Sequence, residues 1–267
     1  MKKADLISAL KNNGIVPGSK LVVHSSYKSI DFEGSPEEVC KSFMEAISEE
    51  GLLVMPAHSP IVKGTPFNPG RTPSAVGAIT EAFRRLPRVS RSLHPSHSVA
   101  AWGRGAKELT AGHQLVDAEG EGSPFFKFSQ TDGKILMLGC TLRACTMGHV
   151  AEWVAKVPHL GVPFSAAFTP TAEYIDDDGK VKTYVYQTYP GCSKMFDKAI
   201  PWLKEAGFLK EISLNKETSL LVDAAGFVKI VYDKLKEDSA ALLTDSEEHF
   251  AKCSHCREAR RLAVKKP

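Results

Sequence analysis

A histidine and a carboxylate stand three residues apart in the segment Thr146–Glu152. The segment follows the apolar run Ile135–Leu138 and precedes Pro158, so a strand followed by a helix is predicted. Side chains three apart on a helix face the same side, which lets His149 and Glu152 act as a general base and the group that orients it. A solvated polar helix face has the same spacing, so the pattern by itself leaves both interpretations open.

The position of this histidine within the helix affects its chemistry. If Thr146 caps the helix, His149 lies in the first turn, where the positive end of the helix disfavours a charged imidazole. We therefore expect a neutral ring with a pKa near its ordinary value of about 6.5. Such a ring can accept a proton from an attacking nucleophile, with Glu152 stabilising the cation that forms. The Thr146 hydroxyl and the free backbone N–H groups of the first turn can hold a developing oxyanion.

Two further polar clusters adjoin predicted strands. His24–Ser29 comes directly after the apolar run Leu21–Val23, and Arg91–Ser98 leads into a strand predicted at 98–102. Ligands of α/β proteins bind beyond the carboxyl ends of parallel strands, and small hydroxyls with backbone amides suit phosphate groups. Together with the His149 helix, these clusters predict one binding site.

The six cysteines offer two alternative chemistries. A nucleophilic thiol is possible at Cys145, which comes one turn before His149, or at Cys192. The pair Cys253 and Cys256 has the spacing of zinc ligands, but a structural zinc site needs four. The simpler interpretation is two reduced thiols on a C-terminal helix. Candidates to complete a zinc set are His249, His255 and Cys192.

Composition excludes several classes of protein. A net charge of +3 with basic and acidic residues interspersed argues against a nucleic-acid surface. The sequence has no apolar run of 18 residues, so no membrane span is expected. The N-terminus is not followed by the apolar segment that a signal peptide needs. We expect a cytoplasmic protein, monomeric or homodimeric, acting on a small molecule without nucleic acid or membrane.

Helix-start signals organise the chain. Ser35, Pro36 and Glu38 form a capping box for a helix predicted to reach about Glu50. Strands predicted at 21–23 and 52–55 flank this helix, which implies a right-handed parallel crossover. Ser/Thr-Pro starts recur at Thr72-Pro73 and Ser123-Pro124. Other predicted elements are helices at 2–13, 194–206 and 225–237 and a hairpin around 177–179.

These elements predict one α/β domain over residues 1–245. Its sheet is expected to be mixed and largely parallel, flanked by helices, with an added β-hairpin and C-terminal helices. Residues 246–267 carry many charges and are expected to form a C-terminal helix or tail.

The order of the motifs resembles the aminoglycoside N3-acetyltransferases, also called the antibiotic N-acetyltransferase family. The likeness covers roughly residues 20–155. The motifs that carry it are His24-Ser25-Ser26, Gly51–Pro56, Arg91–Gly103, Gly120–Pro124, Asp132–Gly139 and Thr146–Glu152.

This resemblance implies acetyl transfer from acetyl-CoA to an amine of an aminoglycoside-like acceptor, by direct attack and without a metal or an acyl-enzyme. His149 matches the family's catalytic base, and Glu152 and Thr146 belong to the same motif. The segment His58–Thr72 is shorter than in the family and has one aromatic residue, Phe67. The acceptor can therefore be an amine metabolite other than an aminoglycoside. Alternatively, the chain can be a CoA-binding module that acetylates no antibiotic. The residues expected to bind CoA are His24, Ser25, Ser26, Tyr27, Lys28, Ser29, Ser92, His94, Ser123 and Phe125.

Overall fold

A seven-stranded mixed sheet forms the centre of the protein in the computed structural model, which describes residues 1–163, 169–214 and 218–264. Its strand order is β3-β4-β2-β1-β5-β9-β8. The three central strands, β2, β1 and β5, are parallel, and the outer four are antiparallel to their neighbours. The strands are β1 (Lys20–Ser25), β2 (Leu52–Pro56), β3 (Ser90–Arg91), β4 (Val99–Gly103), β5 (Lys134–Leu138), β8 (Leu209–Ser213) and β9 (Thr218–Asp223).

The parallel pair β1–β2 confirms the predicted crossover through α2 (Pro36–Ile47). The capping box also forms, because Ser35 Oγ accepts from the Glu38 amide at 3.2 Å and Glu38 Oε2 accepts from the Ser35 amide at 2.7 Å. The helix ends before the expected Glu50, since Ser48 adopts a φ of 57° and breaks the repeat.

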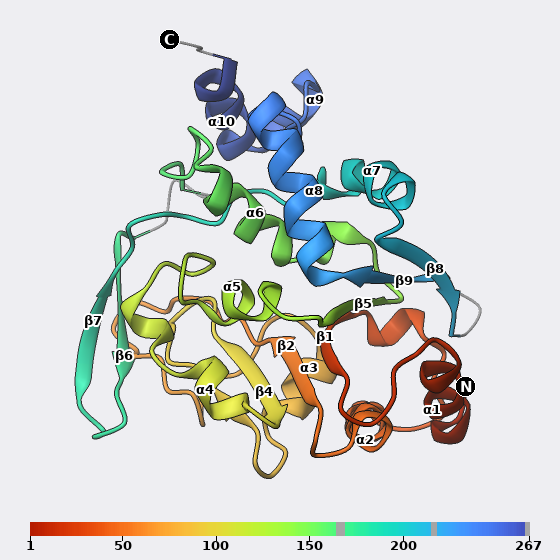
Figure 1. Ribbon diagram of the computed structural model, residues 1–267. Helices are drawn as coiled ribbons and strands as arrows, with labels where there is room; N and C mark the ends of the chain where they lie inside the picture. The colour runs from red at the N-terminus through yellow and green to blue at the C-terminus, as the bar shows by residue number, and fades with distance from the viewer. Residues whose placement is uncertain (164–168, 215–217, 265–267) are drawn as a thin grey trace.

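Helices cover both faces of the sheet (Figure 1). Residues alternate along a strand, so Leu21 and Val23 face one apolar layer and Val22 faces the other. One layer is covered by α1 (Lys3–Asn12), α2 and α3 (Ala78–Phe83), and the other by α4 (Ala106–Thr110), α5 (Pro124–Ser129), α6 (Met147–Ala155), α7 (Ala199–Glu205) and α8 (Ala224–Glu237).

Short 3₁₀ helices join several of these elements. They are η1 (Tyr27–Ser29), η2 (His113–Leu115), η3 (Leu142–Ala144) and η4 (Phe196–Lys198). The last of these runs directly into α7, within the range predicted as helical.

The predicted hairpin is present as β6 (Thr171–Ile175) and β7 (Val181–Val185), and it stands to one side of the main sheet (Figure 1). Its turn closes where the Gly179 amide donates to Asp176 O at 3.0 Å. Phe67 and Leu93 pack against its buried tyrosines.

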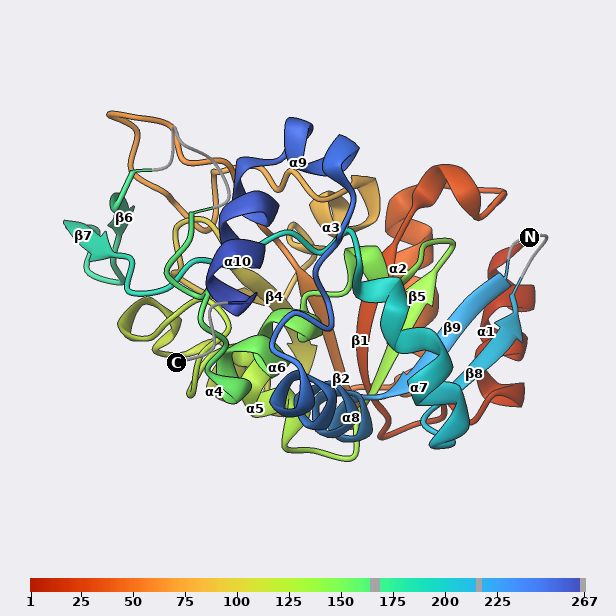
Figure 2. The same cartoon turned by 90° about the horizontal axis from the view of Figure 1, so that it is seen from above.

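Two further helices, α9 (Glu247–Lys252) and α10 (Ser254–Val264), follow α8; they lie at the top of the molecule in Figure 1 and in front of other elements in the view from above (Figure 2). The inner face of α10 is buried through Cys256 and Ala259. Ala259 belongs to a small apolar cluster with Ala240 and Leu243. The described part of the charged C-terminal segment is therefore mostly helical.

Two sequence expectations were wrong or incomplete. Thr72-Pro73 does not start a helix, because the Thr72 hydroxyl accepts from the Asn68 amide and closes a turn, and α3 begins later. The strands β8 and β9 were not predicted. No helix in the described ranges is both long and apolar enough to cross a membrane.

Candidate active site

The carboxyl ends of the parallel strands meet at one edge of the sheet, where ligands of α/β proteins bind. His58 follows β2 at this edge, and η3 and α6 follow β5. A cavity of about 460 Å³ lies here, between the start of α6 and the segment Tyr189–Lys194. His58, His97, Thr146 and His149 all line it. The predicted base therefore faces a pocket.

His149 and Glu152 form the expected pair. The Nδ1 of His149 lies 2.7 Å from Glu152 Oε2, and both side chains are buried. An ionised carboxylate can only accept, so Nδ1 donates the hydrogen and Nε2 keeps its lone pair. The pair thus fixes the ring in the tautomer that a general base needs.

The electrostatics correct one expectation. Burial lowers the pKa of His149, but the hydrogen bond to Glu152 and the charge of Glu152 outweigh it, so the pKa is raised rather than left near its ordinary value. For Glu152 burial acts in the other direction and raises the pKa, yet the rings of His149 and His159 outweigh it and bring the pKa down to about 2. The carboxylate is ionised and favours a protonated ring.

Helix α6 has no solvated polar face, contrary to the simpler interpretation of its sequence. Every residue from Met147 to Glu152 is buried. The His149 ring packs edge-on against Phe196, with centroids 4.9 Å apart. A Cβ added to Gly148 would lie 2.1 Å from the same phenyl ring, which explains the glycine beside the histidine.

Thr146 lies beside His149 in the cavity wall but does not cap α6 by its side chain. Its φ and ψ of −59° and −26° are helical, so its hydroxyl makes no capping hydrogen bond. The amides of Gly148 and His149 already donate to Cys145 O and Thr146 O. The first-turn amides expected to be free are thus partly occupied, and the hydroxyl is the better candidate for an oxyanion contact.

Two residues near the pair were missed in the sequence. Glu119 is buried, and burial raises its pKa to about 8, so it is protonated at neutral pH. His159 Nε2 lies 3.6 Å from Glu152 Oε1, too far for a direct hydrogen bond. Glu119 stands next to the motif Gly120–Pro124, which was the available signal for it.

Uncharged histidines surround the rest of the site. The ring centroids of His58 and His97 are 4.6 Å apart, and those of His94 and His113 are 4.8 Å apart. Burial lowers the pKa of His97 and of His113 to about 3, and it holds the pKa values of His58 and His94 well below the ordinary value. His58 comes just after a parallel strand, so the rule that located His24 could also have found it.

Several residues predicted to bind CoA have structural roles within the fold. Ser92 Oγ bonds His113 Nδ1 at 2.9 Å, and His94 Nδ1 accepts from the His97 amide at 3.0 Å. Ser123 caps α5 by accepting from the Phe126 amide at 3.2 Å. Phe125 belongs to the core. Contact of these four side chains with CoA stays a prediction.

The loop after β1 is more open. Ser25, Ser26, Tyr27 and Ser29 are partly buried and Lys28 is exposed. Ser26 Oγ and Ser29 Oγ are 2.8 Å apart, and Tyr27 donates its hydroxyl to Gly34 O. His24 stacks on Phe125, and its buried Nε2 has no hydrogen-bond partner in the described chain.

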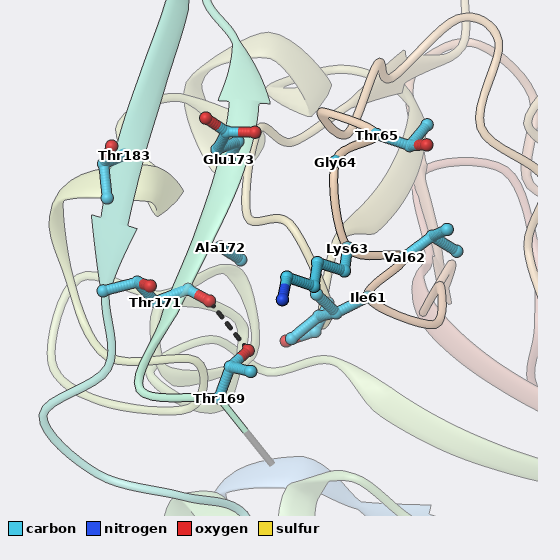
Figure 3. A pocket seen from close by; sticks show the side chains of 11 residues that line it. Ile61, Val62, Lys63, Gly64, Thr65, Thr169, Thr171, Ala172, Glu173 and Thr183 are labelled. Atoms are coloured by element: carbon cyan, nitrogen blue, oxygen red, sulfur yellow. Dashed lines mark hydrogen bonds between the residues drawn. The ribbon is translucent and has the colours of Figure 1, made fainter. Parts of the chain in front are cut away.

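A second, larger cavity of about 730 Å³ is not lined by His149 or Glu152. It lies between the loop 61–65 and β6, and the Lys63 side chain points into it (Figure 3). Ser96 lines this cavity and bonds His97 Nδ1 at 2.8 Å, while His97 lines the smaller one. The predicted base, His149, lines the smaller cavity.

Comparison with known proteins identifies the family of the chain. Residues 22–236 match the family described as Aminoglycoside 3-N-acetyltransferase. The chain belongs to this family. It is 32% identical over 249 residues to aminoglycoside N(3)-acetyltransferase IV from Salmonella sp, covering 92% of both chains.

Solved structures of the family share the whole fold. The apoenzyme of aminoglycoside acetyltransferase AAC(3)-IVa is 31% identical, with a TM-score of 0.80, and 98% of this chain matches 97% of that one. The same enzyme with one histidine replaced by alanine, in complex with a gentamicin, gives a TM-score of 0.84 at the same identity and coverage. The central sheet and its flanking helices are therefore those of this family.

Proposed function

We propose that this protein transfers the acetyl group of acetyl-CoA to an amine of an aminoglycoside, with His149 as general base. The observation that carries the proposal is the buried His149–Glu152 pair, with Nδ1 and Oε2 2.7 Å apart, in the wall of a cavity at the carboxyl ends of parallel strands. Family membership supports the same reaction.

The proton follows a balanced route. The acceptor nitrogen attacks the thioester carbonyl carbon as His149 Nε2 takes a proton from that nitrogen. The carbon–sulfur bond then breaks, and the imidazolium returns the proton to the CoA sulfur. Glu152, with a pKa of about 2, stays ionised throughout and stabilises the imidazolium between the two steps.

The Thr146 hydroxyl is the proposed donor to the oxyanion. It lines the same cavity as His149, one helical turn before it. A fixed donor aimed at developing charge lowers the barrier more than it strengthens substrate binding. We therefore propose that the Thr146 hydroxyl stabilises the transition state rather than the bound substrate.

The loop after β1 is the proposed CoA side of the site. It ends a central parallel strand and holds partly buried hydroxyls at Ser25, Ser26 and Ser29. The buried His24 Nε2 gives a ligand one further polar contact. Backbone amides and small hydroxyls of this kind suit the phosphates and amides of CoA.

A covalent thiol route is disfavoured at Cys145. This thiol is fully buried, and burial raises its pKa to about 12. The reactive form of cysteine is the thiolate, which is scarce at neutral pH for such a group. Direct attack therefore fits better than acylation of Cys145.

One observation favours a second candidate, acetylation of an amine metabolite that is not an aminoglycoside. The described residues that line the cavity include Lys194 and no carboxylate. A polycationic acceptor needs acidic partners for its ammonium groups. Asp117 and Glu121 instead line a separate depression of about 440 Å³.

The test is CoA release from acetyl-CoA with gentamicin, apramycin and a panel of simple amines. We expect turnover with an aminoglycoside, and the His149→Ala variant should keep its fold by circular dichroism but lose about 10²–10⁴-fold in kcat. Turnover confined to simple amines would select the second candidate. Wild-type rates in His149→Ala would refute the proposed base.

A further inference from the structure

Four side chains with zinc-ligand chemistry converge behind the wall of the active-site cavity. They are Cys192, His249, Cys253 and Cys256, and their ligand atoms all lie within 4.8 Å of one another. His249 Nε2 is 3.1 Å from Cys256 Sγ. Cys192 comes from the cavity wall, whereas His249 lies in α9, Cys256 in α10 and Cys253 between these two helices.

The donor set and its spacing suit one metal in particular. Three thiols and an imidazole make a Cys₃His set, which is typical of structural zinc. Tetrahedral zinc with bonds of about 2.3 Å to sulfur places its sulfur atoms roughly 3.8 Å apart. Ligand atoms within 4.8 Å of one another reach this arrangement through shifts of about an ångström.

The local chain explains how three ligands come together. His249 lies in the last turn of α9, Cys253 is the residue that follows this helix, and Cys256 lies in the first turn of α10, so the junction of the two helices brings them together. The Ser246 hydroxyl accepts from the His249 amide at 3.2 Å and fixes the start of α9. The fourth ligand arrives from a distant part of the sequence, as cross-linking metal sites require.

The C-terminal helices bury little apolar surface. No described residue of α9 is buried. The apolar cluster beneath α10 contains only Ala240, Leu243, Ala259 and Ala263. A contact this small contributes little stability, and bound metals commonly supply what small cores lack.

We propose that Cys192, His249, Cys253 and Cys256 bind one Zn²⁺ and thereby fasten the wall of the active-site cavity to α9 and α10. On binding, the three thiols release their protons to solvent and the neutral imidazole gives the lone pair of Nε2. Four protein ligands leave no open position, so the ion is structural and takes no part in acetyl transfer.

The anchored wall contacts both the segment that leads into α6 and helix α10. The Ser193 hydroxyl donates to Arg143 O at 2.6 Å, just before α6. A Cβ on Gly191 would lie 2.5 Å from the His255 ring, which shows how closely the wall packs on α10. Loss of the metal therefore loosens one side of the cavity without touching the His149–Glu152 hydrogen bond.

The test is the metal content of the full chain, purified under reducing conditions without chelator and measured by plasma mass spectrometry. We expect one zinc per chain in the wild type and in Cys140→Ser, a partly buried thiol outside the cluster. The variants Cys253→Ser and Cys256→Ser should lose stoichiometric zinc. Cobalt-substituted wild type should show thiolate-to-cobalt charge-transfer absorption, a readout that needs no variant to fold.

Failure to bind zinc after incubation of the reduced chain with equimolar Zn²⁺ would overturn the proposal, as would stoichiometric zinc in the Cys253→Ser variant. A mass lower by two hydrogen atoms, indicating a disulfide among these thiols, would also overturn it. Removal of zinc by a chelator should lower Tm and raise KM several-fold while the acid limb of the pH profile stays in place. The metal content itself is independent of the proposed acetyl transfer.

Discussion

The replacement Glu152→Gln tests how the site tunes its base. The carboxylate accepts from His149 Nδ1 at 2.7 Å, and its charge is a main reason why the pKa of His149 is raised. Glutamine keeps the shape and an accepting oxygen but removes the charge. We expect the pKa of His149 to fall in the variant, because the protonated ring loses its counter-charge while burial remains.

The magnitude follows from the burial of both groups. A hydrogen bond to a charged group contributes about 1.5–3 kcal/mol. One pKa unit corresponds to about 1.36 kcal/mol, so the pKa of His149 should fall by roughly one to two units. The same loss acts on the imidazolium formed in the transition state, and it lowers the plateau of kcat about tenfold to a hundredfold.

The assay is kcat/KM against pH, which reports the free enzyme. The base must be neutral, so activity rises with pH through the pKa of His149, and the acid limb of Glu152→Gln should lie at lower pH than in the wild type. Glu121→Gln, an exposed carboxylate of the neighbouring motif, is the matched control and should leave the limb in place. An acid limb that is unchanged or lies at higher pH in Glu152→Gln would show that the charge of Glu152 does not raise the pKa of His149.

Three other predictions concern the surroundings of the pair. The Glu119→Gln variant should keep its activity at pH 7, because burial raises the pKa of Glu119 to about 8 and the native group is already neutral. It should also abolish any change in rate that begins near pH 8. A large loss of activity at pH 7 would contradict this prediction. Phe196→Ala should destabilise the fold by about 3–5 kcal/mol in urea unfolding, because a fully buried ring leaves a cavity, and a change below 1 kcal/mol would count against its packing role. Stability should also fall between pH 7.5 and 5.5, because burial lowers the pKa values of His24, His97 and His113 to about 4, 3 and 3. The unfolded chain binds those protons first, which costs about 1.4 kcal/mol for each ring at pH 5.5. Burial also lowers the pKa values of His58, His94 and His255, and together these six rings outweigh the opposite effects of His149 and Glu119, whose pKa values are raised. Equal urea midpoints at the two pH values would refute this prediction.

The central part of the fold was predictable from sequence because its signals are local. The capping box of Ser35 and Glu38 and the apolar runs of β1, β2 and β5 each depend on a few neighbouring residues. The outer strands β8 and β9 were missed, because their alternation is short and their place is decided by pairing, of β9 with β5 and of β8 with β9. The helix start predicted at Thr72 was wrong because the Thr72 hydroxyl accepts from the Asn68 amide, four residues earlier, and closes a turn.

The candidate site was predictable to a similar depth. Helical spacing was sufficient to pair His149 with Glu152, and the strand-end rule placed the pair at the correct edge of the sheet. Spacing says nothing of distant segments, so the wall Tyr189–Lys194 and the buried Glu119 came only from the structure. The zinc-like spacing of Cys253 and Cys256 was visible, but the approach of Cys192 depends on the tertiary fold.

The raised pKa of His149 shows which of two opposing effects prevails. The helix end acts against a charged ring by about 0.3–1 kcal/mol, and this effect fades within a turn. A direct hydrogen bond to a carboxylate contributes about 1.5–3 kcal/mol in favour of the charged ring. The buried setting strengthens the contact further, since little water screens it. Burial alone depresses the pKa of the neighbouring histidines, so the ring that touches an ionised carboxylate is the one suited to hold a proton in transit.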